Sequence, residues 1–250
     1  MKYKRLRNKL TGCFILANGR APIIEEVNYF LNNGYPLLIA ADGGADTCKV
    51  LGLTPDIIAG DFDSVSPETL QLFSKKSKIQ KISGQYDTDV EKCIKVAISM
   101  GIKECVLAGA TGDRLDHSFN NIGMVLKYFP EIRIKLMSES SILQVITGET
   151  KIEGTPGETV SLFGIDDNTL FTTEGLAFPL NRETLPFGKR DGTSNKALTG
   201  IFSVVVEGGK GILIRELEKM TAFRLSKESS PASKKSMLND QKKAFDNNGN

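Results

Sequence analysis

Short apolar segments alternate with helix-like segments over the first 147 residues, and this alternation is the strongest constraint on the fold of the chain. The predicted strands are Cys13–Ala17, Leu37–Ala41, Ile57–Ala59, Ile79–Ile82, Cys105–Ala108, Ile132–Met137 and Ile142–Ile146. The predicted helices between them are Pro22–Leu31, Ala45–Leu51, Pro67–Lys75, Asp89–Met100 and Asp116–Phe129. Such alternation favours right-handed βαβ units and predicts a mostly parallel, doubly wound sheet with helices on both faces.

The pattern changes after Glu149, where glycine, threonine and short β-like segments replace the helical periodicity. The predicted strands of this part are Thr159–Gly164, Leu170–Thr173, Ile201–Val206 and Ile212–Glu216. We therefore predict an α/β domain over residues 1–148 and a smaller antiparallel β domain over residues 149–224. Residues 225–250 are polar and charged with almost nothing to bury, so we predict a disordered tail.

The composition is typical of a soluble globular protein, with 250 residues of which 40% are hydrophobic and 25% charged. The net charge of +2 gives no electrostatic reason to expect nucleic acid as a partner. No apolar segment approaches the roughly 20 residues of a membrane span, and Cys13–Ala17 is too short for the core of a signal peptide. The four cysteines are spaced singly, which predicts buried thiols in a reducing cytoplasm.

Four polar segments begin where predicted strands end, and in doubly wound sheets ligands bind beyond the carboxyl ends of the strands. The segments are Ala41-Asp42-Gly43-Gly44-Ala45, Gly60-Asp61-Phe62-Asp63-Ser64, Gln85-Tyr86-Asp87-Thr88-Asp89 and Gly109-Ala110-Thr111-Gly112-Asp113-Arg114-Leu115-Asp116-His117. All four are expected at one edge of the sheet. There they would bring together four aspartates (Asp42, Asp61, Asp63 and Asp89), two glycine-rich turns and Arg114.

The pair Asp61 and Asp63 is the most unusual of these features. In extended backbone, residues two apart point the same way, so both carboxylates are expected on one side and Phe62 on the other. The two like charges would repel each other. Folding alone gives no reason for this arrangement, so we expect a positive group between them.

Clustered carboxylates suit a hard cation, and Mg²⁺ takes one or two carboxylates together with waters and substrate phosphates. Glycine turns at helix starts offer backbone N–H groups to anions, and Arg114 can donate two hydrogen bonds to phosphate oxygens. These features together indicate phosphoryl-group chemistry. The chain has neither the G-x-x-x-x-G-K-[ST] phosphate-binding loop nor the protein-kinase motifs.

Each feature also has a purely structural explanation. Asp42 can be a turn residue, and Thr88 with Glu91 forms a capping box that starts a helix. The segment from Gly109 to Gly112 can be an ordinary strand-to-helix turn, and the single histidine, His117, can be a helix-surface residue. The pair Asp61 and Asp63 can also belong to a solvated hairpin edge.

The motifs together, in this order, resemble the thiamine pyrophosphokinase family. In the first half they are Asp42-Gly43-Gly44-Ala45, Gly60-Asp61-Phe62-Asp63-Ser64, Thr88-Asp89-x-Glu91-Lys92 and Gly112-x-Arg114-x-Asp116-His117. In the second half they are Ser161-Leu162-Phe163, Thr173-x-Gly175-Leu176, Leu185-x-Phe187-Gly188 and Thr193-Ser194-Asn195. The resemblance covers roughly residues 12 to 215, and the combination is more specific than any single motif.

The resemblance implies an α/β domain that binds nucleotide and metal, followed by a β-sandwich that binds thiamine and forms a homodimer with shared active sites. The implied enzyme is a thiamine diphosphokinase, which transfers pyrophosphate from ATP to the hydroxyl of thiamine and releases AMP. The implied metal ligands for Mg²⁺ are Asp42, Asp61, Asp63 and Asp89. The implied catalytic residues are Asp61, Asp63, Asp89 and Arg114. The implied nucleotide contacts are Asp42, Gly43, Gly44, Ser64, Thr88, Gly112, Arg114, Asp116 and His117. The implied thiamine contacts are Gln85, Phe178, Ser194 and Asn195.

Three positions depart from the pattern of the family. Tyr86 stands where an acidic residue is common, Asp113 stands where glycine is common, and Phe178 stands where tryptophan or tyrosine is common.

Two other functions fit part of the sequence. A Mg²⁺-dependent phosphohydrolase explains the aspartates but not the pattern of residues 159–195, and a binding protein without catalysis does not explain why all four aspartates and Arg114 are present.

Overall fold

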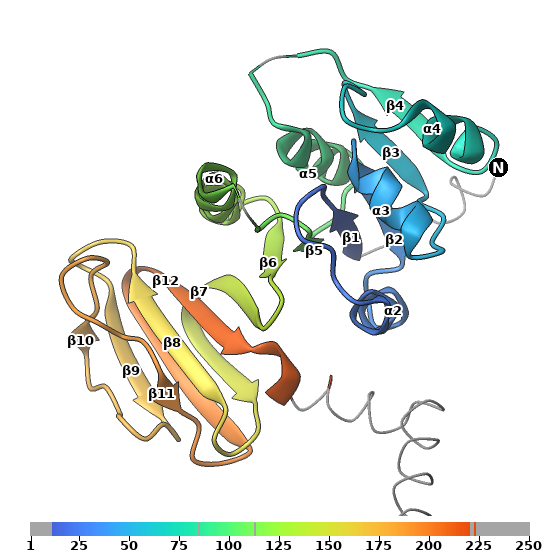
Figure 1. Cartoon of the computed structure of the whole chain (residues 1–250). Helices are drawn as coiled ribbons and strands as arrows, with labels where there is room; N and C mark the ends of the chain where they lie inside the picture. Colours follow the sequence, from blue (N-terminus) through green and yellow to red (C-terminus); the bar gives the residue numbers. More distant parts are fainter. Residues whose placement is uncertain (1–11, 85, 113, 221–222, 224–250) are drawn as a thin grey trace, which may run out of the picture.

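A computed structural model of the chain describes residues 12–84, 86–112, 114–220 and 223 (Figure 1). Gln85 and the predicted tail, residues 225–250, lie outside the described residues. The strands and helices alternate from residue 12 to residue 137, and strands dominate from residue 141 onward. None of the described helices has the length and hydrophobicity needed to cross a membrane.

Six parallel strands form one half of the sheet, in the spatial order β6-β5-β1-β2-β3-β4. The strands are β1 (Gly12–Leu16), β2 (Leu37–Ala41), β3 (Ile57–Gly60), β4 (Lys78–Lys81), β5 (Glu104–Ala108) and β6 (Arg133–Met137). This confirms the predicted parallel, doubly wound sheet. β1 pairs with β2 on one side and with β5 on the other. The strand order reverses between β1 and β5, which is the switch point of the sheet.

Helices cover both faces of the parallel strands (Figure 1). One face carries α2 (Ile24–Asn32), α3 (Gly44–Val50) and α4 (Pro67–Phe73), and the other carries α5 (Asp89–Ser99) and α6 (Leu115–Lys127). Strand residues point alternately to the two faces. β1 therefore contributes Cys13 and Ile15 to one hydrophobic core and Phe14 and Leu16 to the other. All four cysteines are buried and free, as predicted.

Antiparallel strands form the second half of the molecule. They are β7 (Ser141–Glu153), β8 (Thr159–Gly164), β9 (Leu170–Glu174), β10 (Glu183–Thr184), β11 (Asn195–Lys196) and β12 (Ile201–Glu216), followed by the 3₁₀ turn η1 (Leu217–Lys219). β12 pairs with β9 through its first half and with β8 through its second half. Side chains from β7, β8, β9 and β12 pack into one further hydrophobic core.

β12 corrects one prediction, because the segments Ile201–Val206 and Ile212–Glu216 were expected to be separate strands. The structure joins them into one strand whose register with β7 shifts between Val206 and Gly211. Gly208 has a φ of 74°, which glycine adopts without strain. The glycine-rich segment therefore makes an irregularity within one strand instead of a turn between two.

The two halves share a continuous sheet through β7. This strand pairs antiparallel with β6 at its start and with β12 along its length. The division expected between residues 148 and 149 falls within β7, so this strand belongs to both halves. The parallel strands therefore connect to the β domain through backbone hydrogen bonds.

The core of the β domain provides a first test of this fold. Phe202 has 1% of its surface exposed, whereas Phe187 has 70% exposed and contacts the ring of Phe163. Phe202→Ala should lower the free energy of unfolding by about 3–5 kcal/mol, because it leaves a cavity in a packed core. Phe187→Ala should cost about 1 kcal/mol or less. Urea denaturation measures both values, and equal losses would contradict the packing described.

Candidate active site

A cavity of about 630 Å³ lies at the carboxyl ends of β1, β2 and β5, where the order of the strands reverses. Segments that follow these strands line it, together with the first residues of α5 and the first turns of α6. The predicted site residues in its wall are Asp42, Gly43, Ser64, Thr88, Asp89, Gly112, Arg114 and His117. Ligand binding in α/β sheets occurs at such a position.

The segment after β1 also lines this cavity, although no role for it was predicted from the sequence. Asn18, Gly19 and Arg20 belong to the wall. Backbone hydrogen bonds hold the segment against the loop after β5, from Gly19 N to Gly109 O at 2.5 Å and from Arg20 N to Thr111 O at 3.0 Å. The rule that polar residues directly after a buried strand lie at the ligand-binding edge would have found these three residues.

Close packing explains two of the glycines at this edge. A Cβ atom on Gly44 would overlap the carbonyl oxygen of Leu16, and one on Gly109 would overlap that of Ala17. Gly109 also has a φ of 64°. Glycine at these positions allows α3 and the loop after β5 to approach β1 closely. Gly44 therefore shapes the edge from behind and is not part of the cavity wall described above.

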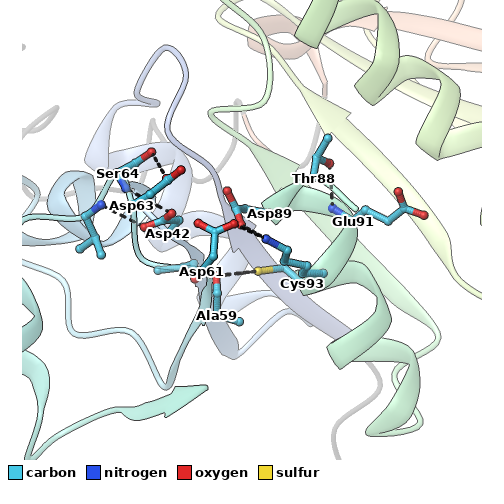
Figure 2. A network of polar contacts seen from close by, with 12 residues as sticks. Asp42, Ala59, Asp61, Asp63, Ser64, Thr88, Asp89, Glu91 and Cys93 are labelled. Atoms are coloured by element: carbon cyan, nitrogen blue, oxygen red, sulfur yellow. Dashed lines mark hydrogen bonds and ion pairs between the residues drawn. The ribbon is translucent and has the colours of Figure 1, made fainter. Parts of the chain in front are cut away.

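Three carboxylates meet beside the cavity. Asp42 follows β2, Asp61 follows β3 and Asp89 is the first residue of α5. Each offers an oxygen atom, and these atoms lie within 4.8 Å of one another. Figure 2 shows the three side chains pointing toward one common region. The structure thus brings together three of the four predicted metal ligands.

Asp63 lies outside this group of three, and the expected extended geometry of the Asp61–Asp63 segment is wrong. Phe62 has a φ of 70°, in the left-handed region, so the alternation of side chains does not hold across it. The Asp63 carboxylate instead accepts a hydrogen bond from the hydroxyl of Ser64 at 2.8 Å (Figure 2). Its role as a metal ligand remains a prediction.

A positive group does lie beside Asp61, but in the ion pairs described it joins Asp61 to Asp89 and not to Asp63: this group is Lys92. Its Nζ atom is 2.7 Å from Asp61 Oδ2 and 2.8 Å from Asp89 Oδ1, and its side chain is 2% exposed. Burial alone lowers the pKa of Lys92, but the hydrogen bonds to the two carboxylates outweigh it and raise the pKa to about 12. Lys92 belongs to the Thr88-Asp89-x-Glu91-Lys92 motif, but the sequence did not predict this role for it.

Asp42 holds the loop after β3 in place. It is 2% exposed, and its carboxylate accepts hydrogen bonds from Val65 N at 2.9 Å and Ser64 N at 3.4 Å. Burial raises the pKa of Asp42, the bond from Val65 opposes this shift, and the negative charge of Asp89 adds to it. Asp42 is thus both part of the carboxylate cluster and a support for its neighbours.

Thr88 caps α5, as the capping-box pattern predicted, and its side-chain oxygen accepts a hydrogen bond from Glu91 N at 3.3 Å. The second half of that pattern is different. The Glu91 carboxylate accepts hydrogen bonds from Lys127 Nζ at 2.6 Å and from the Tyr128 hydroxyl at 2.5 Å. Glu91 therefore ties the start of α5, which carries Asp89, to the end of α6.

The start of α6 brings Arg114 and His117 to the cavity wall. The guanidinium of Arg114 donates two hydrogen bonds to Asp116, at 3.0 and 2.5 Å, and holds the pKa of that carboxyl well below its usual range. Both side chains of this pair are exposed. Asp116 itself is outside the cavity wall, so in this structure it orients the arginine.

Three of the four residues expected to contact thiamine, Phe178, Ser194 and Asn195, lie together in the β domain. Asn195 accepts a hydrogen bond from Phe178 N at 3.0 Å and donates one to Phe178 O at 2.7 Å. Ser194 has a φ of 60°, and its N–H donates to the hydroxyl of Ser161. None of Phe178, Ser194 and Asn195 is among the described residues that line the cavity of the same chain. Gln85 lies outside the described residues.

The architecture and the position of the cavity define this chain as an α/β protein with a cavity at the switch point of its sheet, where such sheets bind ligands. Residues 30–136 match the family model described as the catalytic domain of thiamin pyrophosphokinase. Residues 147–213 match the model described as its vitamin B1 binding domain. The chain therefore belongs to the thiamine pyrophosphokinase family.

Individual relatives agree with this assignment. The chain is 32% identical to thiamine pyrophosphokinase 2 of Oryza sativa subsp. japonica over 64% of its own length and 70% of that protein. It is 26% identical to thiamin pyrophosphokinase 1 of Caenorhabditis elegans over 79% of its length and 86% of the relative. The crystal structure of thiamine pyrophosphokinase from Bacillus subtilis shares the fold, with a TM-score of 0.72, 23% identity and coverage of 82% and 98% of the two chains. These relatives identify the chain as an enzyme of this family.

The loop that carries Asp61 runs from β3 to α4, and Asp46 in α3 holds it at Ser66, directly before α4. Asp46 therefore offers a test of how that loop is positioned. It accepts hydrogen bonds from Ser66 N at 2.9 Å, Ser66 Oγ at 2.6 Å and Thr69 Oγ1 at 2.5 Å. Asp46→Asn should lower the free energy of unfolding by about 1–3 kcal/mol, because an amide cannot accept all of these bonds. Glu68→Gln, an exposed change on the neighbouring α4, should stay within about 0.5 kcal/mol of wild type.

The difference in unfolding free energy between wild type and Asp46→Asn should depend on pH, and the sign of that dependence is defined. Burial raises the pKa of Asp46, but the hydrogen bonds from Ser66 and Thr69 outweigh it and lower the pKa in the folded state. The ionised carboxylate therefore contributes stability above the unfolded pKa of about 3.9, and this contribution is lost as the pH falls through the folded pKa. The gap between wild type and Asp46→Asn in urea should be complete at pH 7 and shrink below about pH 4. A gap that is the same at both pH values would contradict this role.

Proposed function

We propose that the chain transfers pyrophosphate from ATP to the hydroxyl of thiamine, giving thiamine diphosphate and AMP, with Mg²⁺ as the metal. The observation that carries the proposal is the cluster of Asp42, Asp61 and Asp89 beside the cavity, in a chain that matches both the catalytic and the vitamin B1 binding models of the family. Carboxylates with glycine turns and an arginine at the carboxyl edge of a parallel sheet suit phosphoryl transfer.

The residues present fit a magnesium ion. Oδ1 of Asp61 is buried and accepts no hydrogen bond from any of the described residues, which leaves one carboxylate oxygen available to a cation. Asp42 and Asp89 supply neighbouring oxygens, and oxygen donors are the ligands that Mg²⁺ prefers. When bound, the ion would supply positive charge to the phosphate oxygens that these residues face.

The residues of the cavity wall would hold the nucleotide. The planar guanidinium of Arg114 can donate two hydrogen bonds to phosphate oxygens. Asp116 holds this guanidinium in position. Ser64 and Thr88 offer hydroxyl groups, and Gly112, which has no side chain, would let the backbone approach the nucleotide closely. His117 lines the same wall from the first turn of α6 and would contact the nucleotide from there.

The proposed reaction is an attack of the thiamine hydroxyl oxygen on the β-phosphorus of ATP. The bond between that phosphorus and the α,β-bridging oxygen breaks, and AMP leaves with the bridging oxygen. One of the aspartates at the edge accepts the hydroxyl proton. Arg114 stabilises the negative charge that develops on the transferred group and the leaving AMP.

We also propose that the active site is shared between two copies of the chain, in a cytoplasmic homodimer. Phe178, Ser194 and Asn195 are clustered in the β domain but do not line the cavity of their own chain. Phe178 is an exposed apolar side chain and would present its face to thiamine. A two-fold dimer can place each cluster over the cavity of the partner. The four buried free cysteines suit a reducing compartment.

The products distinguish this function from its two alternatives. With ATP, Mg²⁺ and thiamine, AMP and thiamine diphosphate should appear in a one-to-one ratio, and both should depend on thiamine. Chromatography of the nucleotides and thiamine esters measures this. Phosphate release without thiamine would identify a phosphohydrolase, and tight binding of both substrates without any product would identify a binding protein.

Complementation tests the shared site. Asp61→Asn and Asn195→Ala should each abolish turnover, and the two variants should be unfolded together and refolded as a mixture. Random pairing makes about half of the dimers mixed, and each mixed dimer has one intact site, so activity should recover to roughly a quarter of wild type. The matched control mixes Asp61→Asn with Asp89→Asn, where every site retains a lesion and no recovery is expected. Mixed dimers confirmed by mass that remain inactive in the first mixture would reject the shared site.

A further inference from the structure

Lys92 is a buried cation whose position the proposed chemistry does not itself explain. It lies on α5 one turn after Asp89, and its side chain is 2% exposed. Burying an ammonium group is costly unless it is paired and hydrogen-bonded. Its two partners are carboxylates from different elements, Asp61 after β3 and Asp89 at the start of α5.

The hydrogen bonds of Lys92 leave one part of the cluster open. Lys92 takes Oδ2 of Asp61 and Oδ1 of Asp89. The other oxygen of Asp61, Oδ1, is the buried atom that accepts no hydrogen bond from the described residues. The lysine therefore occupies one oxygen of each aspartate and leaves another for a cation.

The charges of the three carboxylates and Lys92 support the same conclusion. When ionised, Asp42, Asp61 and Asp89 carry three negative charges, and Lys92 reduces the net charge of the cluster to minus two. One divalent cation then neutralises it. Without Lys92 the three carboxylates would repel one another more strongly in the metal-free protein, and they would attract a cation more strongly.

We propose that Lys92 is a positioning residue that acts as a built-in counter-ion: it holds Asp61 and Asp89 together without metal and weakens the affinity of the cluster for a free divalent cation. This inference rests on the proposed metal-dependent function. Its consequence is that the chain depends less on free metal to keep the site assembled, so that the site is already in place when a metal–nucleotide complex arrives.

Removing a lysine that has only a structural role would not change the affinity of the cluster for a cation. Lys95 provides the comparison, because it lies on the same helix, is 47% exposed and pairs with Asp87 at 2.6 Å and Glu91 at 3.6 Å. It contacts none of the three clustered carboxylates in the ion pairs described. Lys95→Met therefore removes a lysine–carboxylate contact from α5 without changing the charge next to Asp61 and Asp89.

The experiment compares Lys92→Met and Lys95→Met in the full chain, with Mn²⁺ alone as the probe and neither ATP nor thiamine present. Melting temperature is measured with and without Mn²⁺, and Mn²⁺ affinity is measured by calorimetry. Lys92→Met should melt lower than wild type without metal, and Mn²⁺ should recover most of that loss. Its Mn²⁺ affinity should rise by roughly tenfold or more, because a unit charge a few ångströms away acts strongly inside a protein. Lys95→Met should match wild type in Mn²⁺ affinity.

A double variant keeps the test decisive if Lys92→Met alone does not fold. Lys92→Met with Asp89→Asn removes one positive and one negative charge together, so it should melt higher than the single variant without metal. If the double variant is no more stable than the single one, the lysine acts through packing and the proposal is wrong. The proposal is equally overturned if Lys92→Met binds Mn²⁺ no more tightly than wild type. If wild type itself binds no Mn²⁺, the proposed metal site fails first, which separates the two hypotheses.

Discussion

Repulsion between carboxylates that meet at one edge of the sheet is the constraint that the surrounding structure has to offset. Asp42, Asp61 and Asp89 come from three different segments, and their oxygens lie within 4.8 Å of one another. Backbone N–H groups hold Asp42, whereas Asp61 and Asp89 share the ammonium group of Lys92. The cluster is therefore fixed by hydrogen bonds and one ion-pair network, which is how a site can be organised before its ligands bind.

The supports of this cluster extend into the hydrophobic cores on both faces of the sheet. On one face, Glu91 joins α5 to α6 through Lys127 and Tyr128, so the helix that begins with Asp89 cannot shift independently. On the other face, Asp46 of α3 holds the loop after β3 at Ser66. Substitutions several residues away from the cavity are therefore expected to act on the site through geometry, because small displacements strongly affect phosphoryl transfer.

The sequence predicted the parallel strands, the helices and the edge of the sheet at which the carboxylates meet, because buried strands and amphipathic helices have different periodicities. It did not predict the left-handed φ of Phe62, which separates Asp63 from Asp61, since a non-glycine residue gives no sign of that conformation. It also missed Asn18 and Arg20, although these follow a buried strand in the same way as the predicted segments. The single long β12 was missed because a glycine-rich segment indicates a turn and an irregular strand equally well.

The separation between the cavity and the β-domain cluster determines how the two substrates could meet. The cavity and its carboxylates are complete within one chain, whereas Asn195 fixes the backbone of Phe178 in a different part of the molecule. A cavity at the edge of a parallel sheet is open to solvent on one side, and transfer to an alcohol has to exclude water as a competing acceptor. A partner β domain that carries the acceptor would provide that exclusion as it binds. Closure of the site and delivery of thiamine would then be the same event, which would explain why the carboxylate cluster and the proposed thiamine contacts lie in different domains.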